Sequence, residues 1–198
     1  MRWAKEIVIA ILAAFMLSAC SAEAGTEIIT IETVKENDLA ELSATYVGDN
    51  SRVLGIVQEL PGAETLKELN LQGEKVRITY GTKKGSLPQG DVLAYWFDDN
   101  KAMEKNFLYN AVYLTLLVPN SSSYAFRIDD FSFAIEREEM VEILSEEFLD
   151  FPAGDEAWNQ EVVEVFIEDN RREIEGWVES GAMRKNFFSE HPVIYISN

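Results

Sequence analysis

Apolar side chains recur at two spacings along this chain, and these spacings predict where helices and strands form. In the stretch ATYVGDNSRVLGIVQELP, four apolar residues follow the i, i+3, i+4, i+7 spacing of one helix face: Val53, Ile56, Val57 and Leu60. Gly48 permits a turn before them, and Asp49, Asn50 or Ser51 can cap the first backbone amides. Pro61 and Gly62 end the predicted helix.

Three later segments also carry helical spacing. Residues 101–118 predict a buried helix, although their β-branched and aromatic side chains leave a strand as the alternative. Residues 137–149 predict an amphipathic helix. Residues 156–180 predict a longer, acidic one that stops at Gly181.

Alternation of apolar and polar residues predicts strands elsewhere. Residues 69–71 and 76–80 flank a glycine-containing turn and predict a β-hairpin. Residues 91–97, DVLAYWF, are apolar on both faces and predict a central third strand. The runs 124–128 and 131–135 predict a second hairpin, with one long bent strand as the alternative.

Two weaker alternating segments lie near the ends of this region. Residues 27–35 fit a short strand or a linker, and 193–195 fit a last strand. Together these elements predict an α+β fold: an antiparallel sheet of about four to six strands with helices on one face. The acidic helix and tail after residue 150 would pack alongside as a C-terminal extension.

The first twenty residues differ from the rest of the chain. Arg2 and Lys5 precede an apolar run from Ile7 to Ala19, which is typical of a secretory signal and short for a membrane span. The end of this run, Leu-Ser-Ala-Cys at 17–20, is similar to the lipobox of bacterial lipoproteins. That resemblance implies cleavage before Cys20 and acylation of its thiol and new amino group. An ordinary cleaved signal, or a membrane helix with an incidental cysteine, is the alternative.

These patterns divide the chain into four parts. Residues 1–19 form the signal peptide, and residues 20–38 form a tether that can include the short strand. Residues 39–150 form the α+β domain, and residues 151–198 form a C-terminal helix and tail. A length of 198 residues suits one ordinary domain with such extensions.

Charge limits the partners of this protein. The chain has 17 Lys and Arg against 35 Asp and Glu residues, a net charge of −18. Such a surface repels nucleic acids and anionic lipid head groups, so we expect no nucleic-acid binding. The negative charge is explained by solubility, and binding of a basic partner is the alternative explanation.

The inventory of reactive residues is small. Cys20 is the only cysteine and His191 the only histidine, so once Cys20 carries lipid, a cysteine nucleophile, a disulfide or a zinc site lacks its parts. Neither a phosphate-binding loop nor a dinucleotide motif occurs in the sequence. We therefore expect no catalytic residues of these classes, no metal and no cofactor.

Paired carboxylates are the remaining candidates for chemistry. Asp98 with Asp99, and Asp129 with Asp130, could act as acid and base or hold calcium. Neither pair has the spacing of a calcium loop, and both fall where turns and helix caps are predicted. Turn and cap roles are therefore favoured over catalysis.

Two further features admit a binding role. The loop GTKKGSLPQG could hold an anion through Lys83, Lys84 and its backbone amides, although a solvated connection is favoured. Asn110 falls on or beside an apolar run, where a buried amide needs partners. A packing role is favoured for Asn110 over a ligand contact.

The run YVGDNS with the helix behind it, then RITYG, NAVYLTLLVPN and YAFRID, resembles a bacterial domain family of unknown function, number 4825. The likeness covers roughly residues 40–148. Members of that family occur as lipoproteins and as extracytoplasmic modules of membrane metallopeptidases similar to β-lactam antirepressors. The resemblance carries no catalytic residues and no peptidase module, so it implies a sensing or binding module. The candidate ligand-binding residues are Tyr46, Asp49, Asn50 and Asn110.

The leading hypothesis is a membrane-anchored extracytoplasmic lipoprotein that acts as a non-enzymatic binding or sensing module. Its partners would be the membrane, through lipid on Cys20, and an envelope protein or small molecule. One alternative is an envelope hydrolase that uses the two aspartate pairs. The other is a purely structural surface protein.

Overall fold

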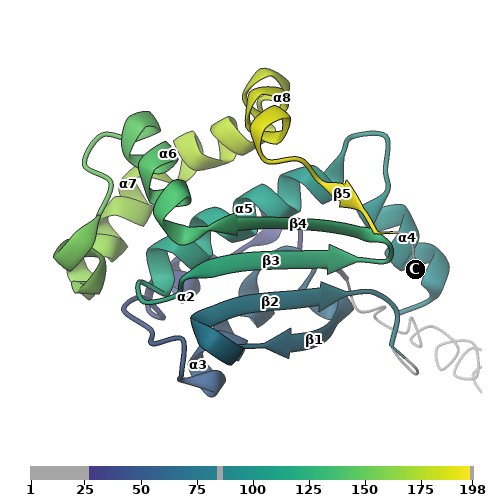
Figure 1. The fold of residues 1–198 in the computed structure, drawn as a ribbon, viewed down its shortest axis with the longest axis horizontal. Coiled ribbons are helices and arrows are strands. Elements are labelled where there is room, and N and C mark those ends of the chain that lie inside the picture. The colour runs from purple at the N-terminus through teal and green to yellow at the C-terminus, as the bar shows by residue number, and fades with distance from the viewer. Residues whose placement is uncertain (1–26, 84–86, 197–198) are drawn as a thin grey trace, which may run out of the picture.

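The computed structural model describes residues 27–83 and 87–196, which are built around one β-sheet (Figure 1). The strands lie in the order β1-β2-β3-β4-β5 across this sheet. β2 and β3 pair in parallel, and the other neighbours pair antiparallel. The strand bounds are β1 Leu66–Asn70, β2 Lys75–Tyr80, β3 Ser123–Ile128, β4 Phe131–Glu136 and β5 Ile194–Tyr195.

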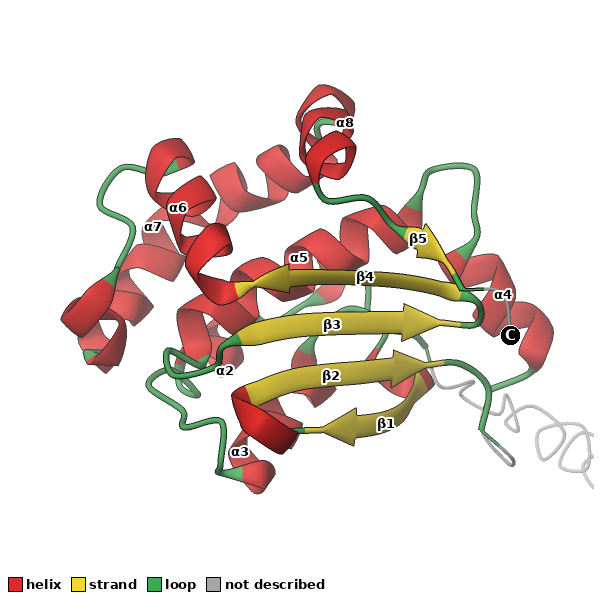
Figure 2. Cartoon of the chain, viewed as in Figure 1, coloured by secondary structure: helices red, strands yellow, loops and turns green. Residues whose placement is uncertain are grey.

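Seven α-helices occur within the described residues (Figure 2). Their bounds are α2 Glu36–Ala40, α3 Asn50–Glu59, α4 Gln89–Trp96, α5 Ala102–Leu117, α6 Arg137–Glu147, α7 Gln160–Glu179 and α8 Gly181–Glu190. Short 3-10 turns accompany them: η1 Ile31–Thr33, η2 Ala63–Thr65, η3 Gln72–Glu74 and η4 Gly154–Trp158. The predicted α+β class and the C-terminal helices are confirmed, and the observed sheet is mostly antiparallel.

The helices lie behind and beside the sheet in Figure 1, which leaves the other face of the sheet open. β2 shows the consequence for its side chains. Val76, Ile78 and Tyr80 are at most 1% exposed, whereas Arg77 between them is exposed. This alternation is the period-two pattern of a sheet that is buried on one face.

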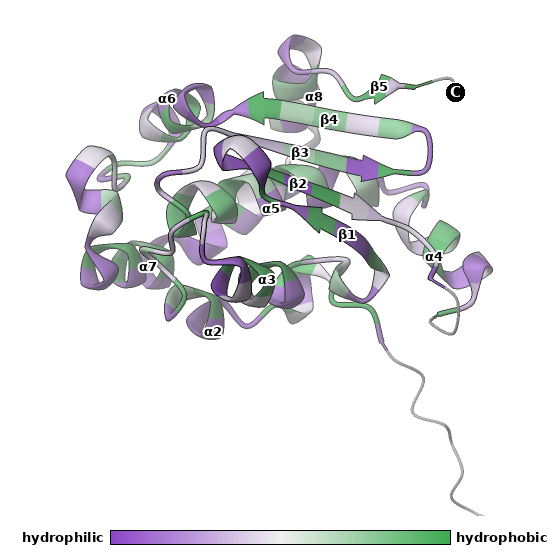
Figure 3. Ribbon diagram, turned by 60° about the horizontal axis from the view of Figure 1, so that its bottom comes forward, coloured by the Kyte–Doolittle hydropathy of each residue, from purple (hydrophilic) through white to green (hydrophobic). Residues whose placement is uncertain are grey.

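α5 is the central helix of the fold. Every residue from 106 to 117 is buried, because the sheet covers one side of α5 and α7 contacts another. Figure 3 shows hydrophobic residues along much of α5 beneath the sheet. Phe107 of α5 stacks on Phe126 and Phe133 of the sheet, with ring centroids 5.5 and 6.2 Å apart. Among the described residues, no helix has the length and apolar character needed to cross a membrane.

The helices predicted at 53–60, 101–118, 137–149 and 156–180 correspond to α3, α5, α6 and α7. Both predicted hairpins are confirmed as β1–β2 and β3–β4, and the last strand is confirmed as β5. The bent-strand alternative for residues 124–135 is therefore wrong.

The predicted third strand at residues 91–97 is wrong, because this segment forms α4. Its two buried residues, Val92 and Trp96, are four positions apart, which is a helical spacing. The carbonyl of Pro88 accepts hydrogen bonds from the amides of Asp91 and Val92 and so starts the helix. Because α4 and α5 carry the chain from β2 to β3, those two strands run parallel, which differs from the fully antiparallel expectation.

The short-strand alternative for residues 27–35 is also wrong, since the chain there forms η1 and leads into α2. The hydroxyl of Thr33 accepts a hydrogen bond from the backbone amide of Thr30 at 2.9 Å, which favours a turn. Ile31 and Val34 are buried. The part of the predicted tether at 20–26 lies outside the described residues.

The long helix ends at Glu179, next to the predicted stop, but Gly181 is the first residue of α8 and does not end helical structure. Ser180 separates α7 from α8, and its hydroxyl accepts a hydrogen bond from the amide of Met183 at 3.4 Å. α8, whose buried residues are Arg184 and Phe187, was not predicted. One turn of spacing is too short a pattern to predict a helix alone.

Candidate functional site

The predicted residues near the start of α3 occupy a surface turn. Tyr46 is 62% exposed, and its ring packs on Trp158 with the ring centroids 4.5 Å apart. The carboxylate of Asp49 accepts a hydrogen bond from the amide of Arg52 at 3.1 Å and caps α3. Asn50 is the exposed first residue of that helix.

Asn110 lies apart from this turn, in the core under the sheet. It is fully buried and donates to the Pro61 carbonyl at 3.2 Å and to the Tyr80 hydroxyl at 2.8 Å. Its own side-chain oxygen has no hydrogen-bond partner among the described residues. The structure therefore places Asn110 as a clamp between α5, β2 and the turn that follows α3.

The aspartate pairs occupy turns and caps. Asp98 accepts a hydrogen bond from the amide of Ala102 at 2.8 Å, at the start of α5, and Asp99 is exposed. Asp129 has a φ of 53° in the turn between β3 and β4. The Asp130 carbonyl accepts from the amide of Ile196 at 2.7 Å. Within the described residues, no His, Cys, Asp and Glu side chains cluster as a metal site would require.

The other sequence candidates fall in part outside the structure. Cys20 and Lys84 lie outside the described residues, so the lipid attachment and the anion-binding loop are not placed here. The Nδ1 atom of His191 lies 3.5 Å from the Glu139 carboxylate, after the end of α8.

A polar cluster occurs where α2 meets α7 and α5, and we call it the α2–α7 junction. It consists of Glu36, Tyr109, Tyr113, Arg171 and Glu175. Glu36 is only 7% exposed and accepts a hydrogen bond from the Tyr109 hydroxyl at 3.4 Å. The ring of Tyr109 stacks on Tyr113 with a centroid separation of 4.6 Å. The buried Tyr113 hydroxyl has no hydrogen-bond partner among the described residues.

Burial and the carboxyl group of Glu36 together set the electrostatics of this junction. Burial raises the pKa of Glu175, which is raised further because its neutral form hydrogen-bonds to Glu36 and because Glu36 is negatively charged, while the positive charge of Arg171 lowers it. Burial also raises the pKa values of Tyr109 and Tyr113 above their ordinary range, so both rings stay neutral. The junction thus brings together two carboxyl groups, of which Glu175 holds its proton more tightly than an isolated glutamate.

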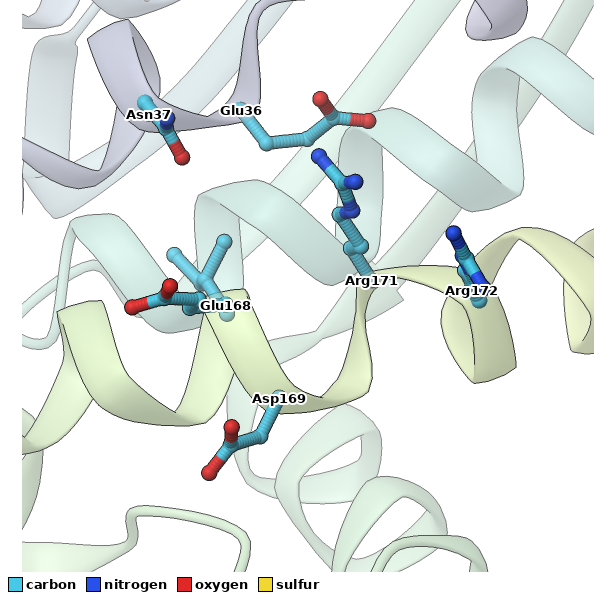
Figure 4. A pocket seen from close by; sticks show the side chains of 7 residues that line it. Glu36, Asn37, Glu168, Asp169, Arg171 and Arg172 are labelled. Atoms are coloured by element: carbon cyan, nitrogen blue, oxygen red, sulfur yellow. The ribbon is translucent and has the colours of Figure 1, made fainter.

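A cavity of about 540 Å³ opens beside the junction. Figure 4 shows Glu36 from α2 and Arg171 from α7 pointing toward each other across it. The lining is Glu36, Asn37, Ile167, Glu168, Asp169, Arg171 and Arg172. A guanidinium can bind an anionic oxygen, while a buried carboxylate accepts from an N–H or O–H group. This arrangement is suited to a small polar molecule that carries both kinds of group.

Sequence reasoning missed this site because its residues come from distant segments. Glu36 fell in the predicted tether, and Glu175 is one of many acids on an acidic helix. One available signal was the Arg171-Arg172 pair, the only basic residues between positions 160 and 179. A basic pair on an otherwise acidic helix indicates a face whose charge differs from that of the rest of the helix.

Comparison with known proteins places most of the folded core in one family. No curated protein and no solved structure is significantly similar to this chain. The model of the family described as a domain of unknown function (DUF4825) matches residues 39–139, about half of the chain. That range runs from α2 into α6 and includes Tyr109 and Tyr113, whereas Glu36, Arg171 and Glu175 lie outside it. The chain therefore belongs to the DUF4825 family.

Proposed function

We propose that this protein is a bacterial lipoprotein, anchored through Cys20 on the outer face of a membrane, that serves as a non-enzymatic binding or sensing module. The observation that carries the proposal is the sequence Leu-Ser-Ala-Cys at 17–20, directly after a basic head and an apolar run. The sole cysteine of the chain stands at the position that lipid attachment requires. More than one acyl chain would make the anchoring stable.

Metabolic labelling with an alkyne analogue of palmitate tests the anchor. We expect wild type to incorporate the label and to fractionate with membranes, and Cys20→Ala to lose both properties. Ser21→Ala is the matched control and should behave as wild type. Label on Cys20→Ala, or an intact amino terminus in the cytosol, would contradict the proposal.

The binding part of the proposal is supported by the α2–α7 junction. Its cavity presents Arg171 and Arg172 beside a buried carboxylate, which suits a small zwitterionic or anionic molecule. The likeness to extracytoplasmic modules of antirepressor-like metallopeptidases supports a role in sensing. An envelope protein would then bind the ligand-bound form of this protein in preference to the ligand-free form.

Thermal-shift measurements with amino acids, dicarboxylates and soluble cell-wall fragments test this site. A ligand should raise the melting temperature of wild type, and the shift should disappear in Arg171→Ala/Arg172→Ala. Lys67→Ala/Arg77→Ala, two exposed cations on β1 and β2, is the control and should retain it. If the ligand still raised the melting temperature of Arg171→Ala/Arg172→Ala, its binding site would lie elsewhere.

A hydrolase is the second candidate, and the Glu36 and Glu175 pair favours it. A protonated carboxyl beside a second carboxyl can act as a general acid with a base. Turnover of an envelope substrate should then fall at least about 100-fold in Glu36→Gln and in Glu175→Gln. Glu168→Gln, which also lines the cavity, should remain active. The aspartate pairs, in their turn and cap positions, are weaker candidates for this chemistry.

A further inference from the structure

A second groove lies on another side of α7, toward the loop that follows α6, and we call it the acid-rimmed groove. It encloses about 670 Å³. Its floor is apolar and consists of Leu149, Val162, Val165 and Phe166. Its rim is acidic and consists of Asp150, Glu161, Asp169 and Glu173.

The floor combines a fixed base with exposed apolar side chains. Phe166 is 5% exposed and packs edge-on against Phe148 and Phe151, with ring centroids 6.3 and 5.4 Å apart. Leu149 and Val165, by contrast, are 85% and 53% exposed. Adjacent apolar side chains this exposed are typical of a surface that a partner covers.

The backbone around Leu149 keeps this side chain outward. Asp150 has a φ of 60°, a left-handed conformation that Asp adopts more readily than most residues other than glycine. It turns the chain after α6, so that Leu149 stays in solvent while the neighbouring Phe148 and Phe151 enter the core.

Charge selects the occupant of the groove. Every charged residue that lines it is a carboxylate, and the whole chain carries a net charge of −18. An anionic lipid surface or a second acidic chain would be repelled, whereas Lys or Arg side chains would pair with the rim. The occupant must therefore be apolar on one side and basic on its flanks.

The length of the groove suits a helix. Its lining runs along α7 from Glu161 to Glu173, roughly 18 Å at the rise of an α-helix. We propose that the acid-rimmed groove binds a basic amphipathic helix of another protein. The apolar face of that helix packs on Leu149 and Val165, and its basic flanks face Asp169, Glu173 and the other rim carboxylates.

The groove also lies at a suitable end of the molecule. The first described residues join the fold at α4, where the Tyr95 hydroxyl donates to the Ile29 carbonyl at 2.9 Å. Figure 1 places α4 at one end of the sheet and the loop between α6 and α7 at the other. A tether at the amino terminus would direct the groove away from the membrane. This orientation rests on the proposed anchor, whereas binding of the helix does not.

The test uses the full-length chain in nanodiscs of zwitterionic lipid, with empty nanodiscs as reference. The probe is a fluorescein-labelled amphipathic helix of 18 residues made of Lys and Leu, and fluorescence anisotropy measures its binding. We expect saturable binding above the reference and at least a tenfold loss of affinity in Leu149→Ser/Val165→Ser. Asp169→Asn/Glu173→Gln should also weaken binding, and added salt should weaken it further.

Two control variants and two control peptides make the result specific. Leu93→Ser/Ile194→Ser removes exposed apolar side chains elsewhere, and Glu138→Gln/Glu142→Gln removes two exposed charges from α6. Both variants should bind as wild type does. A Glu–Leu helix and a scrambled, non-amphipathic Lys–Leu peptide should bind at least tenfold more weakly than the probe. Circular dichroism checks that each variant is folded.

Three outcomes would overturn the proposal. Equal loss of binding in the control and groove variants would mean general attraction to an acidic surface. If the protein bound the Glu–Leu helix as tightly as the Lys–Leu probe, the rim carboxylates would have no role in selecting the occupant. Sedimentation that shows a dimer without peptide, lost on Val165→Ser, would make a second copy of this chain the occupant. Absence of lipid on Cys20 would change the orientation and leave these binding results standing.

Discussion

At the scale of single residues, a buried polar cluster fixes the turn that follows α3. The indole N–H of Trp96 donates to the Thr65 hydroxyl at 3.0 Å, and that hydroxyl donates to the Gly62 carbonyl at 2.7 Å. Asn110 holds the preceding carbonyl of Pro61. Buried polar groups are costly unless they are paired, so these bonds specify one backbone path through the core.

Gly62 is a position where only glycine fits. Its φ is 84°, and an added Cβ would lie 2.5 Å from the Trp96 ring. Gly62→Ala should therefore lower the free energy of unfolding by about 2–4 kcal/mol. Gly176→Ala is the control: it lies in α7 with open space around it and should stabilise by roughly 0.5–1 kcal/mol. Urea unfolding followed by tryptophan fluorescence measures both, and equal effects would contradict the argument.

Asn110→Leu tests the packing role of this amide. The substitution keeps the branched shape and the number of side-chain heavy atoms but leaves the Tyr80 hydroxyl and the Pro61 carbonyl without their donor, so stability should fall by about 2–4 kcal/mol. Tyr80→Phe removes only one acceptor and should cost about 1 kcal/mol. Chemical denaturation measures both variants. Normal stability of Asn110→Leu combined with loss of ligand binding would instead indicate a recognition residue.

At the scale of elements, helices and strands with a longer repeating pattern of apolar residues were predicted correctly. α3, α5, α6 and α7 repeat their apolar spacing over several turns, and both hairpins repeat theirs on two strands. The prediction for α4 was wrong because residues 91–97 are apolar at almost every position. Such a run does not distinguish a helix from a buried strand. α8 was not predicted because its buried residues, Arg184 and Phe187, do not repeat over enough turns to show a helical spacing.

The start of α3 allows a cap to be separated from a recognition residue. Asp49→Ala removes the acceptor for the Arg52 amide and should cost about 1 kcal/mol of unfolding free energy. Asn50→Ala, at the next and exposed position, should change stability by less than roughly 0.5 kcal/mol. Thermal and urea unfolding measure the pair. A larger loss in Asn50→Ala would mean that the cap is assigned to the wrong residue.

At the scale of the whole molecule, the fold extends beyond the range that the family model matches. α7 follows that range, yet it packs against α2 and α5, and it buries Phe166, Ile167 and Ile174. The α2–α7 junction exists only because the two segments meet. No local pattern in the sequence states which distant elements pack together, so this site could not be predicted from the sequence even though α7 itself was.

The junction should make stability depend on pH. Burial and Glu36 raise the pKa of Glu175 in the folded chain above its value in the unfolded chain. Its stabilising contribution is therefore complete below the unfolded pKa and is lost as pH rises through the folded pKa. Glu175→Gln keeps the neutral form, so it should match wild type in acid and exceed it in stability near neutral pH.

Unfolding free energies measured from acid to neutral pH check this expectation. Glu173→Gln removes an exposed charge from the same helix and reports the general effect of a smaller net charge. The advantage of Glu175→Gln over Glu173→Gln should grow with pH. An advantage that is constant with pH would exclude proton binding at the junction as its cause.

The parallel seam between β2 and β3 has a consequence for folding kinetics. Each hairpin closes over a short loop and can form on the microsecond timescale, but the seam must bring together strands that α4 and α5 separate. Docking of the two hairpins on α5 should then limit the folding rate. Ile78 and Phe126, which face each other across the seam, would belong to the transition state, and truncating them would slow folding more than it hastens unfolding.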